Sequence, residues 1–314
     1  MTVIREVNTN SVGRGEAVPY ARYGESLPSV MSQLESMRPL VEGGLSRESL
    51  LKSLPAGAAR NAIDCALWDL EAQVSGMDVA NVLGEFPVEP MTTAVTIGLD
   101  APAAMAAAAR AIALAPLIKI KVDARDAAAQ IQAVREVCPQ SELIVDPNES
   151  WDLDILRAMQ PVLVEQRIAV LEQPLPAGSD SLLDGFVTSV PICADESCHT
   201  AADLPQLIGR YQFINIKLDK TGGLTTALDL LHQARSRGFG IMVGCMICTS
   251  LSIAPALHVA RHARFADLDG PLWLARDRAG GITLTNQRLQ PPQRGFWGEL
   301  HENSALVQQV ASES

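Results

Sequence analysis

The chain has 314 residues, with 25 Lys and Arg against 36 Asp and Glu, so its formal net charge is −11. This balance disfavours a sequence-independent nucleic-acid binder, which needs clustered basic residues, and a hydrophobic fraction of 47% excludes a disordered chain. The sequence shows no secretion signal and no apolar run long enough to span a bilayer. We therefore expect a soluble, cytoplasmic globular protein of one large domain or two, with no nucleic-acid or membrane partner, and the sequence is compatible with a homo-oligomer.

Residues 1–90 are predicted to form a small α+β domain. A short β-prone run at the start is followed by a glycine-rich stretch and by two short helical segments near 28–38 and 46–53. A longer helix is predicted over 56–76, because its apolar residues recur at helical spacing and Gly76 is a natural stop.

From Met91 onward, short β-branched runs alternate with helical segments, which indicates a parallel sheet. The predicted strands are 92–98, 117–122, 142–146, 168–173, 191–196, 213–219, 240–244 and 264–269. Eight strands favour a closed (β/α)8 barrel over an open doubly wound sheet, for which the glycine-rich phosphate-binding turn is missing. We assign 91–280 to the barrel and expect 281–314 to return to the first domain, with ITLTNQRLQPP as a strand.

Ionisable residues stand at the carboxyl ends of several predicted strands, where a barrel of this kind carries its chemistry. Lys119 and Lys121 are two residues apart, so they share a face of the second strand that we expect to point inward. Each ammonium disfavours charge on the other, which lowers a lysine pKa toward the range of a useful base. The alternative is a solvated pair at the sheet edge.

Strands three, four and five end in Asp146, Glu172 and Asp195. Taken singly, each acid is explained by capping of the following helix. Three such acids in succession after a Lys-x-Lys pair instead favour a hard divalent cation such as Mg²⁺, which prefers oxygen ligands.

Lys217 follows the apolar run of strand six, which lies half a barrel away from strand two. Bases on these two strands would face one central point from opposite sides, as required to remove a proton from one face of a carbon and return one to the other. Asp267 and Asp269 share a face at the end of strand eight and suit a substrate cation, although Asp269-Gly270 is also an ordinary turn sequence.

The order K-x-K, D-x-N, E, D-E, K and D-x-D along a barrel resembles the enolase superfamily, in its muconate-lactonising subgroup, and within that subgroup the dipeptide epimerases. The resemblance covers nearly the whole chain. It is carried by PYARYGES, LPAGAARNAIDCALWDL, LIVDPNESW, LEQPLPA, PICADESCHT, NIKLDKTGGL, GCMICTS and FADLDGP.

The resemblance implies one Mg²⁺ per subunit, a dipeptide substrate and a role for each of these residues. Metal ligation is implied for Asp146, Glu172 and Asp195, acid–base catalysis for Lys121 and Lys217 assisted by Lys119, substrate binding for Lys119, Asp267 and Asp269, and orientation of the ligands and of Lys217 for Asn148, Glu196 and Asp219.

The implied activity is epimerisation of L-Ala-D/L-Glu or a similar dipeptide in murein peptide recycling. It would proceed by two-base 1,1-proton transfer through a metal-stabilised enediolate. Two alternatives keep the fold and the metal, namely an N-acylamino-acid racemase and an o-succinylbenzoate synthase-like enzyme. A third is an inactive ligand-binding relative, because family members begin with a longer stretch that contains a first strand and a mobile loop over the site. The resemblance therefore implies that the capping domain is shortened here.

Overall fold

The computed structural model of the chain describes residues 1–300, and residues 301–314 lie outside the described part. The predicted return of 281–314 to the first domain can therefore be followed only as far as residue 300. Within residues 1–300, no helix is both long enough and apolar enough to cross a membrane.

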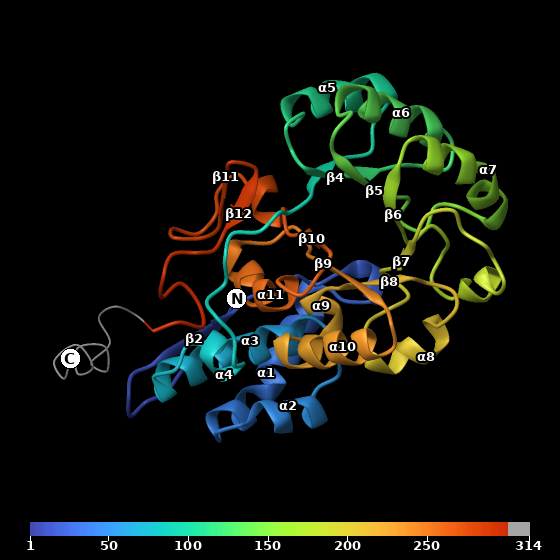
Figure 1. The fold of residues 1–314 in the computed structure, drawn as a ribbon. Helices are drawn as coiled ribbons and strands as arrows, with labels where there is room; N and C mark the ends of the chain where they lie inside the picture. The colour runs from blue at the N-terminus through green and yellow to red at the C-terminus, as the bar shows by residue number, and fades with distance from the viewer. Residues whose placement is uncertain (301–314) are drawn as a thin grey trace.

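Eight parallel strands form one sheet in which each strand pairs with the next along the chain (Figure 1). They are β3 (Val95–Ile97), β4 (Leu117–Lys121), β5 (Glu142–Asp146), β6 (Ile168–Glu172), β7 (Ile192–Ala194), β8 (Phe213–Ile216), β9 (Gly240–Gly244) and β10 (Phe265–Asp267). The first and last strands meet, because Ala94 N donates to Ala266 O at 2.7 Å and Leu268 N donates to Thr93 Oγ1 at 2.8 Å. The predicted (β/α)8 barrel is thus confirmed.

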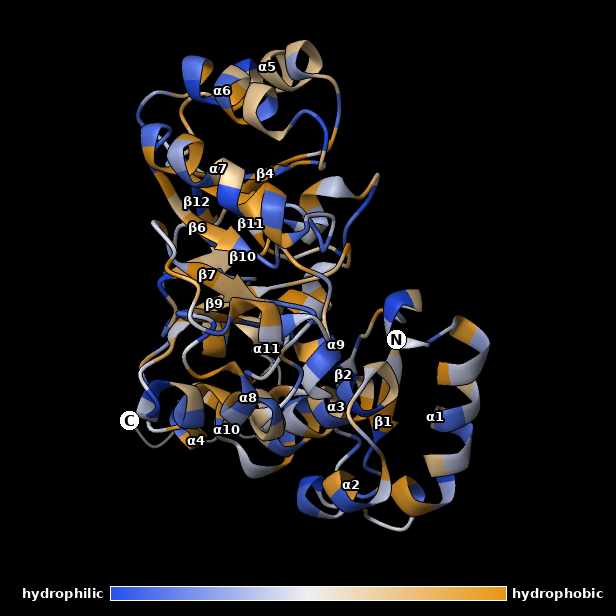
Figure 2. Cartoon of the chain, turned by 90° about the vertical axis from the view of Figure 1, so that its right-hand side faces the viewer, coloured by the Kyte–Doolittle hydropathy of each residue, from blue (hydrophilic) through white to orange (hydrophobic). Residues whose placement is uncertain are grey.

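Helices cover the outside of the barrel, and Figure 2 shows hydrophobic residues concentrated on the strands inside. The helices are α5 (Pro102–Ala111), α6 (Ala127–Val137), α7 (Leu153–Glu165), α8 (Leu204–Leu207), α9 (Leu218–Thr221), α10 (Leu224–Ser236) and α11 (Ser250–Ala260). The sixth strand was predicted to run to residue 219, but β8 ends at Ile216 because the short helix α9 begins at Leu218.

The barrel interior is layered. Its lower layer is an apolar cluster that includes Leu117, Ile144, Val170, Cys193 and Phe265. Side chains alternate along a strand, so the residue two positions further also faces inward. These second residues are Lys119, Asp146, Glu172, Asp195 and Asp267. A ring of charged side chains therefore lies directly above the apolar layer.

The capping domain consists of a hairpin and four helices. These elements are β1 (Thr2–Arg5), β2 (Val12–Gly15), α1 (Leu27–Glu42), α2 (Arg47–Ser53), α3 (Ala58–Ser75) and α4 (Val79–Val82). Helix α3 packs against the hairpin, α1 and α2 and also against α9 and α10 of the barrel. Its buried polar residues join the two parts: Arg60 Nη2 donates to Thr221 O at 2.6 Å, and Asp64 Oδ2 accepts from Thr225 N at 3.0 Å.

The C-terminal segment differs from the prediction. Strands β11 (Thr283–Thr285) and β12 (Arg288–Gln290) pair with each other, and Leu289 bridges to Met91, so within residues 281–300 no strand returns to the first domain. The reason is the connection Asn286-Gln287, in which both residues have positive φ (51° and 60°), as a tight hairpin turn requires. Loop residues past the hairpin contact the capping domain instead: Gly298 N donates to Asp69 Oδ1 at 2.8 Å.

We predict that Gly15→Ala destabilises the protein, because β2 lies against α3 with no room for a side chain. A Cβ at this position would lie 2.1 Å from Ala62 O and 2.8 Å from Ala66 N. Overpacking of this kind costs about 1–3 kcal/mol, to be measured as the free energy of unfolding in urea. The control is Gly98→Ala, whose Cβ meets nothing within 4 Å. Equal stability of the two variants would contradict the close packing of β2 on α3.

Candidate active site

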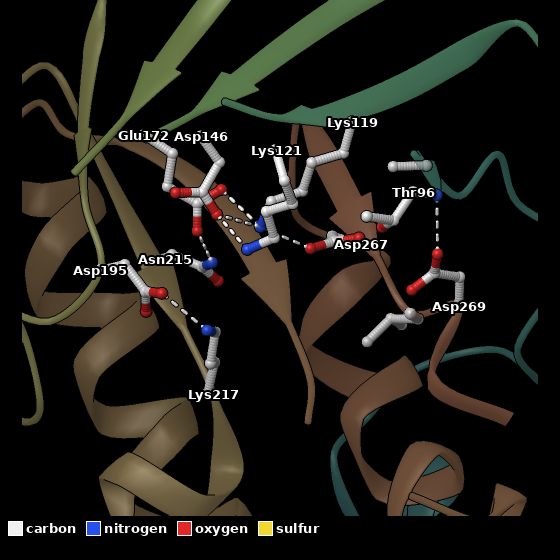
Figure 3. A network of polar contacts seen from close by, with 12 residues as sticks. Thr96, Lys119, Lys121, Asp146, Glu172, Asp195, Asn215, Lys217, Asp267 and Asp269 are labelled. Atoms are coloured by element: carbon white, nitrogen blue, oxygen red, sulfur yellow. Dashed lines mark hydrogen bonds and ion pairs between the residues drawn. The ribbon is translucent and has the colours of Figure 1, made fainter. Parts of the chain in front are cut away.

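The charged ring lies at the carboxyl ends of the barrel strands, where Figure 3 shows its lysines and acids converging. Lys119 of β4 stands at its centre and is only 2% exposed. Its Nζ lies 2.7 Å from Glu172 Oε2, 2.8 Å from Asp267 Oδ2 and 3.0 Å from Asp146 Oδ2. Burial alone would lower the pKa of Lys119, but these acids hold it well above its usual value. One ammonium thus joins acids from three strands.

Lys121 lies nearer the solvent, with its side chain 30% exposed. Its Nζ donates to Asp146 Oδ2 at 2.6 Å and to Asn148 Oδ1 at 2.7 Å. Although burial opposes it, the pKa of Asp146 is lowered to about 2, because Lys119 and Lys121 both stabilise the anion. Asn148 has φ 46°, and its backbone N–H donates to Asp146 Oδ1 at 2.8 Å. The structure therefore places Asn148 in contact with both Lys121 and Asp146.

Asp195 is held between two lysines on the opposite side of the ring. Lys217 Nζ donates to its Oδ2 at 2.6 Å, and Lys220 Nζ donates to its Oδ1 at 2.6 Å. Burial works against ionisation, yet these cations lower the pKa of Asp195 and the pKa of Lys217 is raised well above its usual value. Because β4 and β8 are four strands apart in a barrel of eight, Lys121 and Lys217 extend from opposite walls.

The two aspartates after β10 have different surroundings. Asp267 Oδ2 accepts from Lys119 Nζ, while its buried Oδ1 has no hydrogen-bond partner among residues 1–300. Asp269 Oδ2 accepts from Thr96 N at 2.8 Å and from Trp273 Nε1 at 3.2 Å. Burial, helped by the charge of Asp267, raises the pKa of Asp269. Asp267 thus belongs to the central group, and Asp269 is anchored at its rim.

The structure places Asp219 in contact with the capping domain, whereas the resemblance implies that it orients the ligands and Lys217. Its Oδ1 accepts from Val18 N at 3.0 Å and from Asn61 Nδ2 at 2.9 Å, both in the capping domain. The reason is helix α9, which begins directly after Lys217 and carries Asp219 within its four residues. Asp219 therefore fastens the capping domain to the barrel.

Glu196 lines a cleft of about 350 Å³ between the two parts of the chain. Arg22 and Tyr23 line this cleft from the capping domain, and His199 and Lys220 line it from the barrel. Glu196 Oε2 is buried without a hydrogen-bond partner in the described part of the chain, and Asn148 Nδ2 lies 3.5 Å from its Oε1. Burial and the nearby Asp195 raise the pKa of Glu196 to about 8.

The fit of these acids to a metal ion depends on their spacing and on the partners of their oxygens. Among residues 1–300, no three His, Cys, Asp or Glu side chains are already grouped closely enough to hold one, because the Lys119 ammonium stands between Asp146 and Glu172. Glu172 Oε2 nevertheless has an ion pair but no well-directed hydrogen bond. Burial raises the pKa of Glu172 to about 7, so its anion is under-compensated. An all-oxygen donor set with a buried carboxylate oxygen that lacks a hydrogen bond among residues 1–300 fits a hard divalent cation.

Sequence reasoning missed two buried residues of this group, Asn215 and Lys220. Asn215 Nδ2 donates to Glu172 Oε1 at 2.7 Å, and Lys220 contacts Asp195 as described above. The available signal was spacing, because Asn215 lies two residues before Lys217 on the same face of β8 and Lys220 lies three residues after it.

Comparisons with known proteins agree with this fold and site. The family described as "Mandelate racemase / muconate lactonizing enzyme, N-terminal domain" matches residues 2–84, and "Enolase C-terminal domain-like" matches residues 103–294. The chain therefore belongs to the mandelate racemase and muconate lactonizing enzyme family of the enolase superfamily, and the predicted resemblance is confirmed.

Two relatives show the closeness of the match. The L-Ala-D/L-Glu epimerase of Escherichia coli (strain K12) is 49% identical over 279 residues, which are 88% of this chain and 87% of the relative. The N-acetyl-D-glutamate racemase of Pseudoalteromonas sp. is 43% identical over 307 residues, which are 96% of each chain. The relatives are epimerases and racemases, so this chain is an enzyme of the isomerase class.

Solved structures show the same architecture. An enolase family member from Agrobacterium tumefaciens with homology to dipeptide epimerases, with bound sodium and L-Ala-L-Glu, has a TM-score of 0.91 and 47% identity, covering 94% of this chain and 90% of its own. A dipeptide epimerase from Methylococcus capsulatus complexed with Mg ion has a TM-score of 0.82 and 32% identity, covering 93% of this chain and 91% of its own.

We predict that Asp219→Asn removes a pH-dependent loss of stability. Burial raises the pKa of Asp219 from 3.8 to about 6, so the folded protein binds this proton more tightly than the unfolded chain. Stability from this group is present below about pH 4 and is lost as the pH rises through about 6. The unfolding free energy of the variant relative to the wild type should therefore rise by on the order of 3 kcal/mol between pH 4 and pH 7.

The exposed acid Asp154, whose side chain is 92% exposed, provides the control variant Asp154→Asn. A difference between Asp219→Asn and the wild type that stays constant across this pH range would contradict the buried carboxyl contact.

Proposed function

We propose that the chain is a Mg²⁺-dependent dipeptide epimerase of the L-Ala-D/L-Glu type. The observation that carries this proposal is the pair Lys121 and Lys217, which extend from opposite walls of the barrel beside buried acids. The names of the Escherichia coli relative and of the structural neighbours support the substrate class. The open acceptor on Asp267 supports a substrate that carries a cation.

Asp146, Glu172 and Asp195 would hold one Mg²⁺, which when bound stabilises the negative charge that develops on the substrate carboxylate as the α-proton leaves. Support comes from the under-compensated charge of Glu172 and from the Methylococcus capsulatus relative complexed with Mg ion. Lys119 would then turn from Glu172 to the substrate carboxylate.

Lys121 and Lys217 would move the proton at the substrate α-carbon. One lysine accepts the α-proton from its face as a neutral amine, and the other donates a proton to the opposite face as an ammonium. Lys217 forms an ion pair with Asp195 that favours its charged form, and loss of that pair would lower its proton affinity. The configuration is inverted because the two lysines reach the carbon from opposite sides.

Asp267 and Asp269 would bind the α-ammonium of the dipeptide. Asp267 offers a buried oxygen that has no hydrogen-bond partner among residues 1–300, and Asp269 is held in place by Thr96 and Trp273. Asn148 would orient Lys121, and Glu196, whose Oε1 lies 3.5 Å from Asn148 Nδ2, would in turn orient Asn148. Recycling of cell-wall peptides in the cytoplasm is the setting that this substrate would imply.

A second candidate is racemisation of an N-acylated amino acid, favoured by the 43% identity to the Pseudoalteromonas racemase over 96% of both chains. Such a substrate lacks the α-ammonium, so Asp267 and Asp269 would have no cation to bind.

Incubation with L-Ala-D-Glu and Mg²⁺ in D₂O should exchange the glutamate α-proton for deuterium and form L-Ala-L-Glu. Proton NMR measures the exchange, and addition of EDTA should abolish it. Parallel incubation with N-acetyl-D-glutamate separates the two candidates. Exchange of the acylated amino acid alone would overturn the dipeptide proposal in favour of the racemase, and exchange of neither compound by folded, metal-loaded protein would overturn both.

Replacement of Lys121 or Lys217 by Met should lower the rate of epimerisation about 10²–10⁴-fold. Each variant should still exchange the α-proton of one of the two epimers. Lys217→Met should retain α-proton exchange for the epimer whose proton faces Lys121, and Lys121→Met should retain it for the other. The control is Lys52→Met, an exposed lysine of α2 that pairs with Glu48. Retention of the same epimer by both variants would contradict the assignment of one lysine to each face.

A further inference from the structure

Two buried residues without a role in the proposed function, Asn215 and Lys220, each bond to one of the proposed metal ligands. Asn215 of β8 is fully buried, and its Nδ2 donates to Glu172 Oε1 at 2.7 Å. Lys220 of α9 is 1% exposed, and its Nζ donates to Asp195 Oδ1 at 2.6 Å, to Asp195 O at 2.5 Å and to Asn215 O at 2.8 Å. All three donors of the Lys220 ammonium are therefore in use, so it has none left for a substrate.

The same division of oxygens occurs at both acids. Glu172 presents Oε1 to Asn215 and Oε2 to Lys119, and Asp195 presents Oδ1 to Lys220 and Oδ2 to Lys217. In Figure 3, a dashed line joins the amide of Asn215 to the carboxylate of Glu172. One oxygen of each acid thus bonds to Asn215 or Lys220. The other oxygen pairs with Lys119 or Lys217, which have roles in the proposed function.

The space for Asn215 depends on a glycine of the neighbouring strand. A Cβ on Gly244 of β9 would lie 2.8 Å from both the Nδ2 and the Oδ1 of Asn215 and 3.1 Å from Lys217 Cε. Gly244 has no strained backbone angle, so its lack of a side chain is explained by this close approach. The amide of Asn215 is therefore fixed between Glu172 on one side and the β9 backbone on the other.

We propose that Asn215 and Lys220 are positioning residues that leave Glu172 and Asp195 one oxygen each for a divalent cation. The proposal rests on the Mg²⁺ site of the proposed function. A carboxylate with one oxygen already bonded cannot rotate freely or chelate through both oxygens, so the cation meets two preset ligands. Lys220 Nζ also donates to the backbone O of Asn215, so the two positioning residues are bonded to each other.

The first test is Asn215→Leu, which removes the donor without a change of charge. Titration calorimetry of the metal-free protein with MgCl₂ alone should show a Kd raised about 10–100-fold. With saturating Mg²⁺, kcat for the dipeptide should fall while KM changes less. The matched control is Gln130→Met, which removes a buried amide of α6 that bonds to Asp123 and should leave the Kd unchanged. Where Leu at 215 prevents folding, Gly244→Ala displaces the same amide and should raise the Kd.

The second test is Lys220→Met, for which charge and position predict opposite results. Loss of a positive charge beside Asp195 would by itself tighten Mg²⁺ binding, whereas loss of positioning weakens it. We expect weaker binding.

The outcomes separate this proposal from the proposed function. A Kd within about twofold of the wild type in folded Asn215→Leu, or tighter binding in folded Lys220→Met, overturns the positioning role alone. A wild-type protein that binds no Mg²⁺ overturns both the metal site and the positioning role.

Discussion

Burial of carboxylates at the mouth of the barrel is the constraint on which the rest of the site depends. Asp146, Glu172 and Asp195 are each at most 1% exposed, and a buried anion is costly unless cations and donors compensate it. Lysines supply that compensation. Side chains alternate along each strand, so the charged residues lie one layer above the apolar residues that face the same way. Glu172 Oε2 pairs with Lys119 but receives no hydrogen bond within residues 1–300, which leaves it open to a further cation.

The same constraint explains how the capping domain is attached. Helix α3 is buried on nearly all sides, so its polar residues must find partners, and they find them in the barrel. Asn61 bonds to Asp219, Arg60 to the backbone at the last residue of α9, and Asp64 to the start of α10. Helix α9 therefore contacts the capping domain through Asp219 and the buried acid Asp195 through Lys220. The cleft lined by Glu196, Arg22 and Tyr23 forms where the two parts meet.

The fold was predictable from the sequence because its strands are short apolar runs at regular spacing, and acids at the ends of successive parallel strands must gather at one edge. Asn215 was not recognised, because a single amide within an apolar run gives no sign of its partner on another strand. The direction of Asp219 depends on a one-turn helix that local patterns assign to the strand. The path of the last hairpin depends on two left-handed residues, Asn286 and Gln287, that carry no glycine signal.

We propose that a cation takes the carboxylate oxygens that lysine ammonium ions contact here, Glu172 Oε2 and Asp195 Oδ2. A crystal structure of the protein with Mg²⁺ and L-Ala-L-Glu tests it most directly. We expect Lys119 Nζ to leave Glu172 Oε2 and Lys217 Nζ to leave Asp195 Oδ2, while Asn215 and Lys220 keep their contacts. Retention of both lysine contacts at saturating Mg²⁺, with no ion among the three acids, would contradict the account.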